Sequence, residues 1–372
     1  MKIGITCYPV YGGSGVVATE LGIQLARRGH EVHFITYAQP FRLPYYMERI
    51  YYHEVDVPKY PLFDYPPYDL ALAAAMHNTT LKRHLDLLHV HYAIPHAASA
   101  WMAREMGNNK VKVVTTLHGT DITLVGQDPS FYSITRFSIQ KSDGITAVSE
   151  SLCRETVLRF DVPKEAIRVI PNFVDLQQYR RDLKPCHRDK LAEPGEKILM
   201  HISNFRPVKR VADGVRVFAR VAKRIPARFV LIGDGPERAK AQQAAEEEGV
   251  ADRVVFLGKQ ESVAELLACA DLFLLPSESE AFGLVALEAM ACGVPVVATA
   301  VGGLPEVVPQ GEAGLLAPVG DLDEMAADAL WLLEDRERWR QFSAAARRTA
   351  EKFSSELVVP MYEGYYDEVL SR

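Results

Sequence analysis

The sequence predicts an α/β protein with two Rossmann-like, doubly wound domains in series. Three observations predict this fold class. Apolar strand-length runs alternate with helical patterns from the first residue, the alternation stops and restarts once, and a chain of 372 residues is too long for one ordinary core. Ligands of such sheets bind beyond the carboxyl ends of the strands, so two facing sheets predict an interdomain cleft.

The first half of the chain opens with a strand at 2–9 and a helix at 15–29. The helix pattern ends on Arg27, Arg28 and Gly29. Cations and a glycine are typical of a helix C-terminus. The same alternation predicts strands at 30–37, 85–93, 111–119 and 144–150, and helices at 97–106, 133–141 and 152–160.

The second half restarts the alternation after a segment at 171–194 that holds prolines, charges and no clear period. We place the domain boundary at the front edge of this segment, which gives domains at 1–170 and 171–350. The end of the chain, 351–372, is aromatic and apolar, and we interpret it as a tail helix that can return to the first domain. The strands predicted here lie at 197–205, 228–237, 253–259, 270–277, 294–303 and 313–319.

The composition is typical of a soluble globular protein, with 48% apolar and 24% charged residues. A net charge of −6 offers no basic surface for nucleic acid or for an anionic membrane. The nearly apolar window 281–301 is long enough for a membrane span, but Glu288, Gly293 and Pro295 indicate a buried helix, a turn and a strand. The cysteines form no C-x-x-C pair, which favours reduced thiols in a cytoplasmic protein: Cys7, Cys153, Cys186, Cys269 and Cys292.

The stretch "YPVYGGSGVVATEL" leads from the first strand into the first helix through several glycines. Gly13, Gly15 and Ala18 match the dinucleotide pattern G-x-G-x-x-A. Binding of a dinucleotide requires an acidic residue at the end of the second strand. That strand ends in "FITYAQP", which contains neither Asp nor Glu. Two alternatives remain: a turn whose amides, with the Ser14 hydroxyl, bind a phosphate or carboxylate, and a tight turn without a ligand.

A basic cluster follows the first strand of the second domain, in "HISNFRPVKR". Asn204, Arg206, Lys209 and Arg210 lie within seven positions at the carboxyl end of that strand. Charges on a loop are often merely solvated. The position at a strand end nevertheless favours phosphate binding, for which arginine offers a fork and lysine a point charge.

The stretch "PSESEAFGLVALEAMACGVPVVAT" carries two glutamates eight residues apart, Glu280 and Glu288. Eight helical residues span ~12 Å, whereas the two carboxylates of a retaining glycosidase lie ~5.5 Å apart, so a glycosidase pair is not expected. Phe282, Gly283 and Leu284 open a helix here, and the amides of residues 283–285 are expected to hold phosphate oxygens. Glu280 would then accept from sugar hydroxyls and Glu288 from a ribose diol, although a capping or solvated role for Glu288 is the alternative.

Histidines gather near the ends of two first-domain strands. His118 follows a strand and precedes Gly119, where it is either structural or faces the ligand site. The set His89, His91 and His96 shares strand geometry suited to zinc, but no thiol or second carboxylate accompanies it. We therefore favour the interpretation that these histidines line the acceptor end together with Tyr92.

Taken together, these motifs resemble the retaining glycosyltransferases of family 4, which have the GT-B fold. The resemblance rests on the Glu280 to Glu288 spacing, the Lys209 loop, "GGSG", "IPNFVD", "ACGVPVVAT" and "GGLPEVV". The stretches "PFRL", "YPPYDLALA", "LHVHYAIPHA", "TTLHGTDIT" and "HISNFRPVKR" are similar to the members of that family in bacillithiol biosynthesis. That similarity implies UDP-N-acetylglucosamine as donor and L-malate as acceptor.

The resemblance also implies a role for each site residue. It places the acceptor in the first domain and the nucleotide sugar in the second, and it implies front-side transfer in which the leaving diphosphate helps to deprotonate the acceptor. We expect no cofactor and no catalytic metal, and the oligomeric state stays open. The family loop G-R-x-x-x-x-K-G reads Ser203, Asn204, then Lys209 and Arg210 here, so we assign the family arginine's role to Arg206. The residues implied are His118, Arg206, Lys209 and Glu280 for catalysis, Gly13, Asn204, Lys259, Phe282, Gly283, Leu284, Val285 and Glu288 for the donor, and Ser14, Tyr92, Thr120 and Arg136 for the acceptor, although Arg136 could be an ordinary exposed helix residue.

Three rival functions remain on the sequence. A family 4 transferase acting on a lipid or polysaccharide would often carry a basic first domain, but residues 1–170 hold 17 Lys and Arg against 16 Asp and Glu. A UDP-N-acetylglucosamine 2-epimerase would release no UDP in the presence of malate. A nucleotide-sugar sensor would bind the donor and turn nothing over.

Overall fold

The structure is a computed structural model that describes residues 1–10, 12–57, 61–62, 64–108, 110–184 and 187–372. It consists of two compact units. The first unit comprises Met1–Asn172 with Glu356–Arg372, and the second comprises Phe173–Ser355. Among the cysteines, Cys186 lies outside the described residues, and the thiols that are described as free are all buried: Cys7, Cys153, Cys269 and Cys292.

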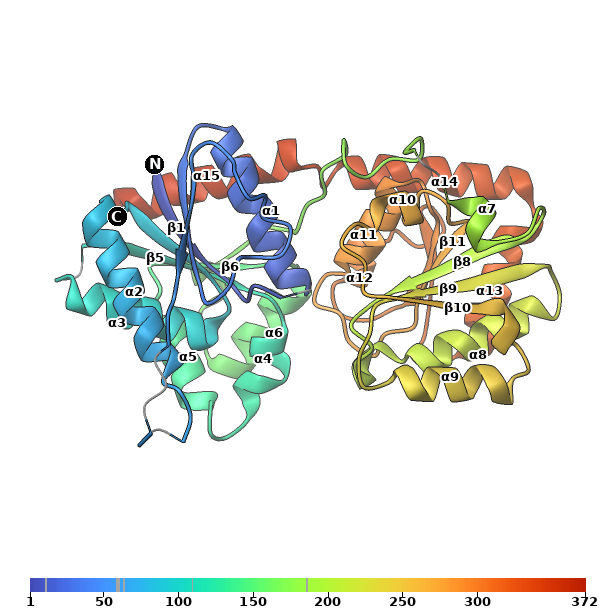
Figure 1. Ribbon diagram of the computed structural model, residues 1–372, viewed down its shortest axis with the longest axis horizontal. Helices are drawn as coiled ribbons and strands as arrows, with labels where there is room; N and C mark the ends of the chain where they lie inside the picture. The colour runs from blue at the N-terminus through green and yellow to red at the C-terminus, as the bar shows by residue number, and fades with distance from the viewer. Residues whose placement is uncertain (11, 58–60, 63, 109, 185–186) are drawn as a thin grey trace. The chain divides into compact units, whose positions relative to one another are not determined.

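The first unit is built on a seven-stranded parallel sheet with the order β3-β2-β1-β4-β5-β6-β7 (Figure 1). β1 lies near its middle, because Ile3 pairs with Val32 on one side and with Leu87 on the other. β4 is buried along its whole length, as expected where helices cover both faces of a parallel sheet. The strands are β1 (Lys2–Thr6), β2 (Glu31–Thr36), β3 (Ile50–Glu54), β4 (Leu87–His91), β5 (Lys112–Leu117), β6 (Gly144–Ala147) and β7 (Ile167–Val169).

The helices and strands of the first unit follow the predicted alternation, but the sequence reasoning missed the strands β3 and β7 and the helices α2 and α4. The edge strand β3 was missed because its side chains are mostly exposed and show no apolar run. The helices are α1 (Gly13–Arg27), α2 (Tyr68–Arg83), α3 (Ala98–Met106), α4 (Thr120–Thr123), α5 (Tyr132–Lys141) and α6 (Glu150–Phe160), with short turns η1 (Ala93–Ala97), η2 (Val125–Gln127) and η3 (Lys164–Ala166).

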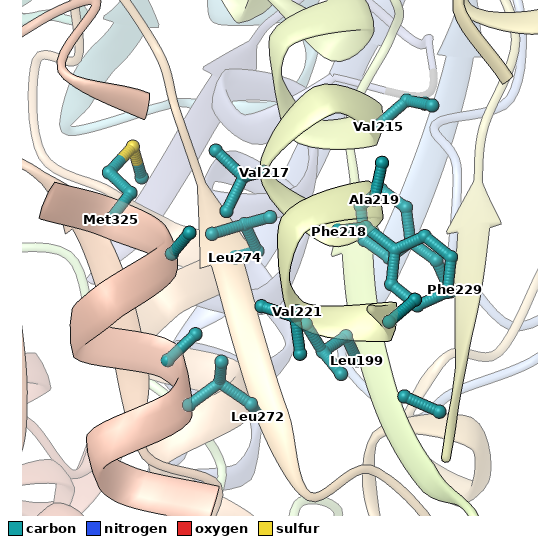
Figure 2. Close-up of a cluster of buried hydrophobic side chains, with 14 of the residues drawn as sticks. Leu199, Val215, Val217, Phe218, Ala219, Val221, Phe229, Leu272, Leu274 and Met325 are labelled. Carbon is teal, nitrogen blue, oxygen red and sulfur yellow. The ribbon is translucent and has the colours of Figure 1, made fainter. Parts of the chain in front are cut away.

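The second unit repeats the same design on a six-stranded parallel sheet, in the order β10-β9-β8-β11-β12-β13. Figure 2 shows its core, in which Phe218 from a covering helix stacks on Phe229 of the sheet at 5.4 Å between ring centroids. Leu199, Leu272 and Leu274 are also fully buried in this cluster. The strands are β8 (Lys197–Ile202), β9 (Ala227–Ile232), β10 (Val254–Gly258), β11 (Leu272–Leu275), β12 (Val296–Thr299) and β13 (Gly314–Ala317).

The helices of the second unit place the nearly apolar window 281–301 inside the protein. The window forms α11 (Leu284–Ala291), a turn at Gly293 and then β12, as the sequence predicted. Along the described part of the chain, no helix is both long and apolar enough to cross a membrane. The remaining helices are α7 (Arg188–Leu191), α8 (Val211–Ala222), α9 (Arg238–Glu247), α10 (Ala264–Leu267), α12 (Leu304–Val307), α13 (Leu322–Glu334) and α14 (Arg336–Glu351), with turns η4 (Pro207–Lys209) and η5 (Ala251–Arg253).

The last helix, α15 (Ser355–Ser371), packs on the first unit. The Tyr366 hydroxyl lies 2.7 Å from Nδ1 of His89 in β4, and the backbone N–H of Ile145 donates to the Tyr365 hydroxyl at 2.9 Å. Glu363 forms an ion pair with Arg28 at the end of α1. Glu368 forms a second ion pair at 2.7 Å with Arg168 of β7, so buried tyrosines and ion pairs attach the C-terminal helix to the first unit.

Candidate active site

Each sheet reverses its strand order at one point, and many of the predicted site residues lie in the loops beside these points. In the first unit the reversal lies between β1 and β4, and in the second between β8 and β11. Ligands of open parallel sheets bind beyond the carboxyl ends of the strands at such a switch point. We call the loops at these two places the first-unit site and the second-unit site.

The glycine turn after β1 combines two different requirements. A Cβ on Gly15 would lie 2.5 Å from the Tyr8 carbonyl oxygen, so the protein's own backbone requires a glycine at this position. A Cβ on Gly13 would meet nothing within 4 Å. Gly13 is the exposed first residue of α1, and the first amides of a helix have no intrahelical partner. Packing thus explains why position 15 is a glycine. It does not explain the glycine at position 13, which is consistent with anion binding there.

A row of rings lies at the carboxyl ends of β1, β4 and β5. Tyr8 contacts Tyr92 with ring centroids 5.4 Å apart, and Tyr92 in turn lies 5.4 Å from His118. Burial raises the pKa of Tyr8 to about 12, and burial lowers the pKa of His118 to about 3. At neutral pH Tyr8 and His118 are therefore uncharged and present a hydroxyl group and an imidazole group as hydrogen-bonding partners.

A buried carboxylate ties two loops of the first-unit site together. Asp121 is 2% exposed and accepts hydrogen bonds from the backbone N–H groups of Ala93, His118 and Gly119. Burial raises the pKa of Asp121 to about 6 in spite of these bonds. Thr120, the first residue of α4, follows directly after Gly119. The loops that carry Tyr92, His118 and Thr120 are thus fixed to one side chain.

Three of the buried histidines of the first unit, His89, His91 and His96, contact one another or neighbouring hydroxyl groups. His89 lies 2.7 Å from the Thr116 hydroxyl and packs on the His91 ring at 4.4 Å. His96 places Nδ1 2.5 Å from the His91 carbonyl oxygen. Within the described residues, no group of three or more His, Cys, Asp or Glu side chains has the arrangement of a metal site.

Arg136 is the one predicted acceptor residue that the structure does not bring to the others. Its Nε donates to the Phe160 carbonyl oxygen at 3.2 Å and its Nη2 to Asp161 at 2.8 Å. Phe160 is the last residue of α6, about 16 Å along the helix from its beginning beside the carboxyl end of β6. Acceptor binding by Arg136 would require the guanidinium to leave these partners.

The second-unit site centres on an ion pair between two predicted residues. Lys209 Nζ lies 2.5 Å from Glu280 Oε1, and the Ser277 hydroxyl donates to the same oxygen at 2.9 Å. Both charged side chains are largely buried, at 20% exposed for Lys209 and 11% for Glu280. Asn204 and Arg206 are exposed on the loop after β8. A partly desolvated lysine beside two exposed donors is suited to hold a phosphate.

Helix α11 supplies the second element of this site. It begins after Gly283, whose φ of +97° requires glycine, and a Cβ there would lie 2.5 Å from the Leu304 side chain. The amides that open the helix, at Leu284 and Val285, have no partner within it. Phe282 directs its side chain into the core, 3% exposed and packed on Phe353, so it can contribute only backbone groups to a ligand.

Glu288 is buried in the middle of α11. It is 4% exposed, and its Oε1 accepts a hydrogen bond of 2.7 Å from the Tyr179 hydroxyl. The expectation that a carboxylate among apolar neighbours has partners therefore holds in the structure. Lys259 is exposed directly after β10, at the carboxyl edge of the same sheet.

Sequence reasoning gave no role to four residues that organise these sites. They are Tyr8, Asp121, Tyr179 and His201, and all but Tyr179 lie in the sequence motifs described above. His201 bridges the switch point, with Nδ1 2.9 Å from the Leu274 carbonyl oxygen and Nε2 2.8 Å from the Ser203 hydroxyl. Burial lowers its pKa to about 4, so it is neutral at pH 7. Tyr8 and Asp121 follow closely after buried strands, which was the available signal for them, whereas nothing local in the sequence marked Tyr179.

Comparison with known proteins gives the family. Residues 11–178 match the family model described as Glycosyltransferase Family 4, and residues 184–349 match the one described as Glycosyl transferases group 1. N-acetyl-alpha-D-glucosaminyl L-malate synthase from Bacillus anthracis is 52% identical over 372 residues, which cover 100% of this chain and 97% of that protein. This chain belongs to glycosyltransferase family 4.

More distant relatives of this family 4 glycosyltransferase share the fold. D-inositol 3-phosphate glycosyltransferase from Nocardia farcinica is 31% identical, covering 92% of this chain and 82% of its own length. The sucrose-phosphate synthase structure from Thermosynechococcus elongatus aligns with a TM-score of 0.82 at 23% identity, covering 100% and 99% of the two chains. Anabaena Alr3699/HepE in complex with UDP and glucose aligns at 0.81 and 21% identity, with the same coverage. The chain therefore has the GT-B fold.

Two glycine variants of the glycosyltransferase separate folding from ligand binding in the turn after β1. We expect Gly15→Ala to lower the free energy of unfolding by roughly 1–3 kcal/mol, because the new methyl group overlaps the Tyr8 carbonyl oxygen. We expect Gly13→Ala to leave the melting temperature unchanged and to lower turnover, because its methyl group occupies the space that an anion would approach. Thermal melts and steady-state rates measure both effects. Full turnover in Gly13→Ala would contradict the interpretation that this turn binds an anion.

Glu288→Gln tests the ribose assignment. The glutamine carbonyl still accepts from Tyr179, so the core contact is retained while the charge is lost. We expect UDP affinity to fall by roughly tenfold, the effect of replacing a charge-assisted hydrogen bond by a neutral one. Isothermal titration calorimetry with UDP measures this, and unchanged affinity would assign Glu288 a structural role only.

Proposed function

We propose that this glycosyltransferase moves N-acetylglucosamine from UDP-N-acetylglucosamine to the hydroxyl group of L-malate, the reaction that begins bacillithiol biosynthesis. The observation that carries the proposal is the 52% identity, over the whole chain, to the Bacillus anthracis protein named for that product. The polar groups at the two switch points support it, because the reaction requires one site for a diphosphate and one for a small polyanionic acceptor.

In this proposal the second-unit site holds the donor. The amides of Leu284 and Val285 at the beginning of α11 meet the diphosphate together with Lys209 and Arg206, and Glu288 accepts from the ribose. The bond from the sugar C1 to the diphosphate oxygen breaks as the bond to the malate oxygen forms, and the malate proton passes to the leaving phosphate. The protein then contributes positioning and stabilisation of the charge that grows on UDP.

The first-unit site would hold the acceptor in the same proposal. Ser14, Tyr92 and Thr120 offer hydroxyl groups, and Gly13 offers a helix-end amide, to a molecule with two carboxylates and one hydroxyl. His118 lies beside Tyr92 and would face the transferred sugar.

The direct test is to incubate the protein with UDP-N-acetylglucosamine and a panel of acceptors. The panel contains L-malate, 1D-myo-inositol 3-phosphate and a no-acceptor control, and both UDP release and product mass are measured. We expect a product of N-acetylglucosamine and malate, with UDP release that depends on malate. UDP release with inositol phosphate alone, or binding of the donor without turnover, would overturn the proposal.

Acceptor choice gives a quantitative prediction. L-Lactate keeps the hydroxyl and one carboxylate of malate, so donors built for the second carboxylate would remain unpaired, and unpaired buried donors are costly. We expect kcat/KM for L-malate to exceed that for L-lactate by at least about tenfold. Steady-state rates at saturating donor measure this ratio, and equal use of both acceptors would contradict a dicarboxylate pocket. The same assay on Arg136→Ala decides whether that guanidinium contributes to the preference.

A further inference from the structure

Two buried histidines of the first unit each have one ring nitrogen with a partner and one without. In His96, Nδ1 lies 2.5 Å from the His91 carbonyl oxygen, while Nε2 is buried and has no hydrogen-bond partner among the described residues. A carbonyl oxygen only accepts, so Nδ1 of His96 carries the proton. The unpaired nitrogen of His96 is therefore the bare one, a lone pair and not an N–H group.

His91 presents the same pattern with a second histidine as its partner. Its Nδ1 lies 2.8 Å from Nε2 of His118, and its own Nε2 is buried without a partner in the described part of the chain. Two proton arrangements satisfy the bond. Either His91 donates from Nδ1 to His118, or His118 donates to His91 and the His91 proton sits on the unpaired Nε2.

The second arrangement leaves a buried N–H group without any acceptor. Orphaned buried N–H groups are rarer in proteins than under-satisfied acceptors. The His91 ring is fully buried, so no solvent reaches that nitrogen. The first arrangement, in which His91 Nδ1–H donates to His118 Nε2, avoids the orphaned donor and matches the arrangement that the carbonyl oxygen imposes on His96.

This arrangement decides what His118 can offer to a ligand. Because Nε2 of His118 accepts from His91, the proton of the neutral His118 ring resides on Nδ1. His118 is partly exposed, and no hydrogen bond to its Nδ1 is present within the described residues. The accessible nitrogen is therefore a donor.

We propose that His91 is a positioning residue that fixes His118 as the Nδ1–H tautomer, so that His118 donates a hydrogen bond to an oxygen of the bound substrate and does not act as a proton acceptor. The inference rests on the proposed function for the presence of a substrate at this site. The tautomer itself is a property of the protein without substrate and can be measured separately.

The first test is the nitrogen spectrum of the histidine rings. Protein labelled with ¹⁵N-histidine is examined by long-range ¹H–¹⁵N correlation, and the His118 signals are assigned by their loss in His118→Asn. We expect a protonated Nδ1 and an unprotonated Nε2 in His118 of the wild-type protein. A protonated Nε2 would overturn the proposal, whatever substrate the enzyme uses.

The second test replaces His91 with two amides of different length. His91→Asn places an amide near the position of Nδ1, where it can still donate to His118, whereas His91→Gln places its amide near the position of Nε2. We expect kcat/KM to fall by about tenfold in His91→Gln, the effect of one lost hydrogen bond, and to stay within about threefold of wild type in His91→Asn. Equal losses in the two variants, at matched melting temperatures, would assign His91 a packing role and overturn the positioning role.

Failure of the inference and failure of the proposed function give different results. If the wild-type protein transfers nothing to malate, the proposed function fails while the His118 tautomer still stands or falls on its spectrum. If transfer to malate is efficient and Nε2 of His118 is protonated, only the inference fails.

Discussion

Lys209→Ala is expected to lower turnover by more than tenfold, a loss of transition-state stabilisation above about 1.4 kcal/mol. In the proposed reaction negative charge grows on the leaving diphosphate, and the Lys209 ammonium group, which pairs with Glu280 in partly desolvated surroundings, would stabilise that charge. A charge in such surroundings interacts more strongly than one in bulk water. Steady-state rates at saturating donor and malate measure the loss.

The control for Lys209→Ala separates catalysis from folding. Lys223 has an ammonium group that is 67% exposed and lies 4.0 Å from its carboxylate partner Glu248, so Lys223→Ala should retain wild-type turnover. Removing Lys209 also leaves the Glu280 carboxylate without its cation, so rates are compared well below both melting temperatures. Near wild-type turnover in a folded Lys209→Ala protein would remove Lys209 from the mechanism.

The second large effect is a loss of stability in mild acid that originates in the first unit. Burial lowers the pKa of His89 and of His118 to about 3 and of His96 to about 4, and it lowers the pKa of His91 well below its usual value. In the unfolded chain these groups titrate near 6.5. Unfolding therefore takes up protons between about pH 6.5 and pH 4, and stability is lost as the pH falls through this window.

Asp121 has the opposite effect, because it releases about one proton on unfolding in this pH range. Burial raises its pKa to about 6 from about 3.9 in the unfolded chain, so the folded state holds the extra proton in nearly the same window. The four histidines take up about four protons on unfolding and Asp121 releases about one, so the net uptake is about three protons. The free energy of unfolding therefore falls by about 4 kcal/mol per pH unit where the dependence is steepest. His53 in the first unit and His201 in the second have pKa values lowered by burial to about 4 and act in the same direction as the histidine cluster.

Urea unfolding curves recorded between pH 7 and pH 5 measure the slope of the free energy of unfolding against pH. His96→Asn keeps a donor near Nδ1 for the His91 carbonyl oxygen and removes one titrating ring, so the slope should decrease by about 1.4 kcal/mol per pH unit. His84 is exposed at the end of α2, and His84→Asn serves as the matched control with an unchanged slope. A wild-type stability that is constant across this range would show that the histidine cluster is not held neutral by burial.

The amino-acid sequence alone predicted the fold class and placed the candidate ligand-binding residues at strand and helix ends. Apolar strand-length runs that alternate with helical patterns, with glycines and cations at helix ends, predicted most of the strands and the parallel sheets. The same local patterns placed Gly13, Lys209 and Gly283 at strand and helix ends, because those positions depend only on neighbours in the chain. The edge strand β3 was missed because an exposed strand carries little hydrophobic pattern.

Which side chains contact one another depends on the packing of the folded chain. Lys209 and Glu280 are 71 residues apart, Tyr179 and Glu288 are 109 apart, and Tyr366 reaches His89 across 277 residues. No local period encodes such pairs, because each depends on strand order and on helices that return to a sheet. The protonation of the buried histidines follows from the same packing, since desolvation by distant segments, and not the residue type, sets their pKa values.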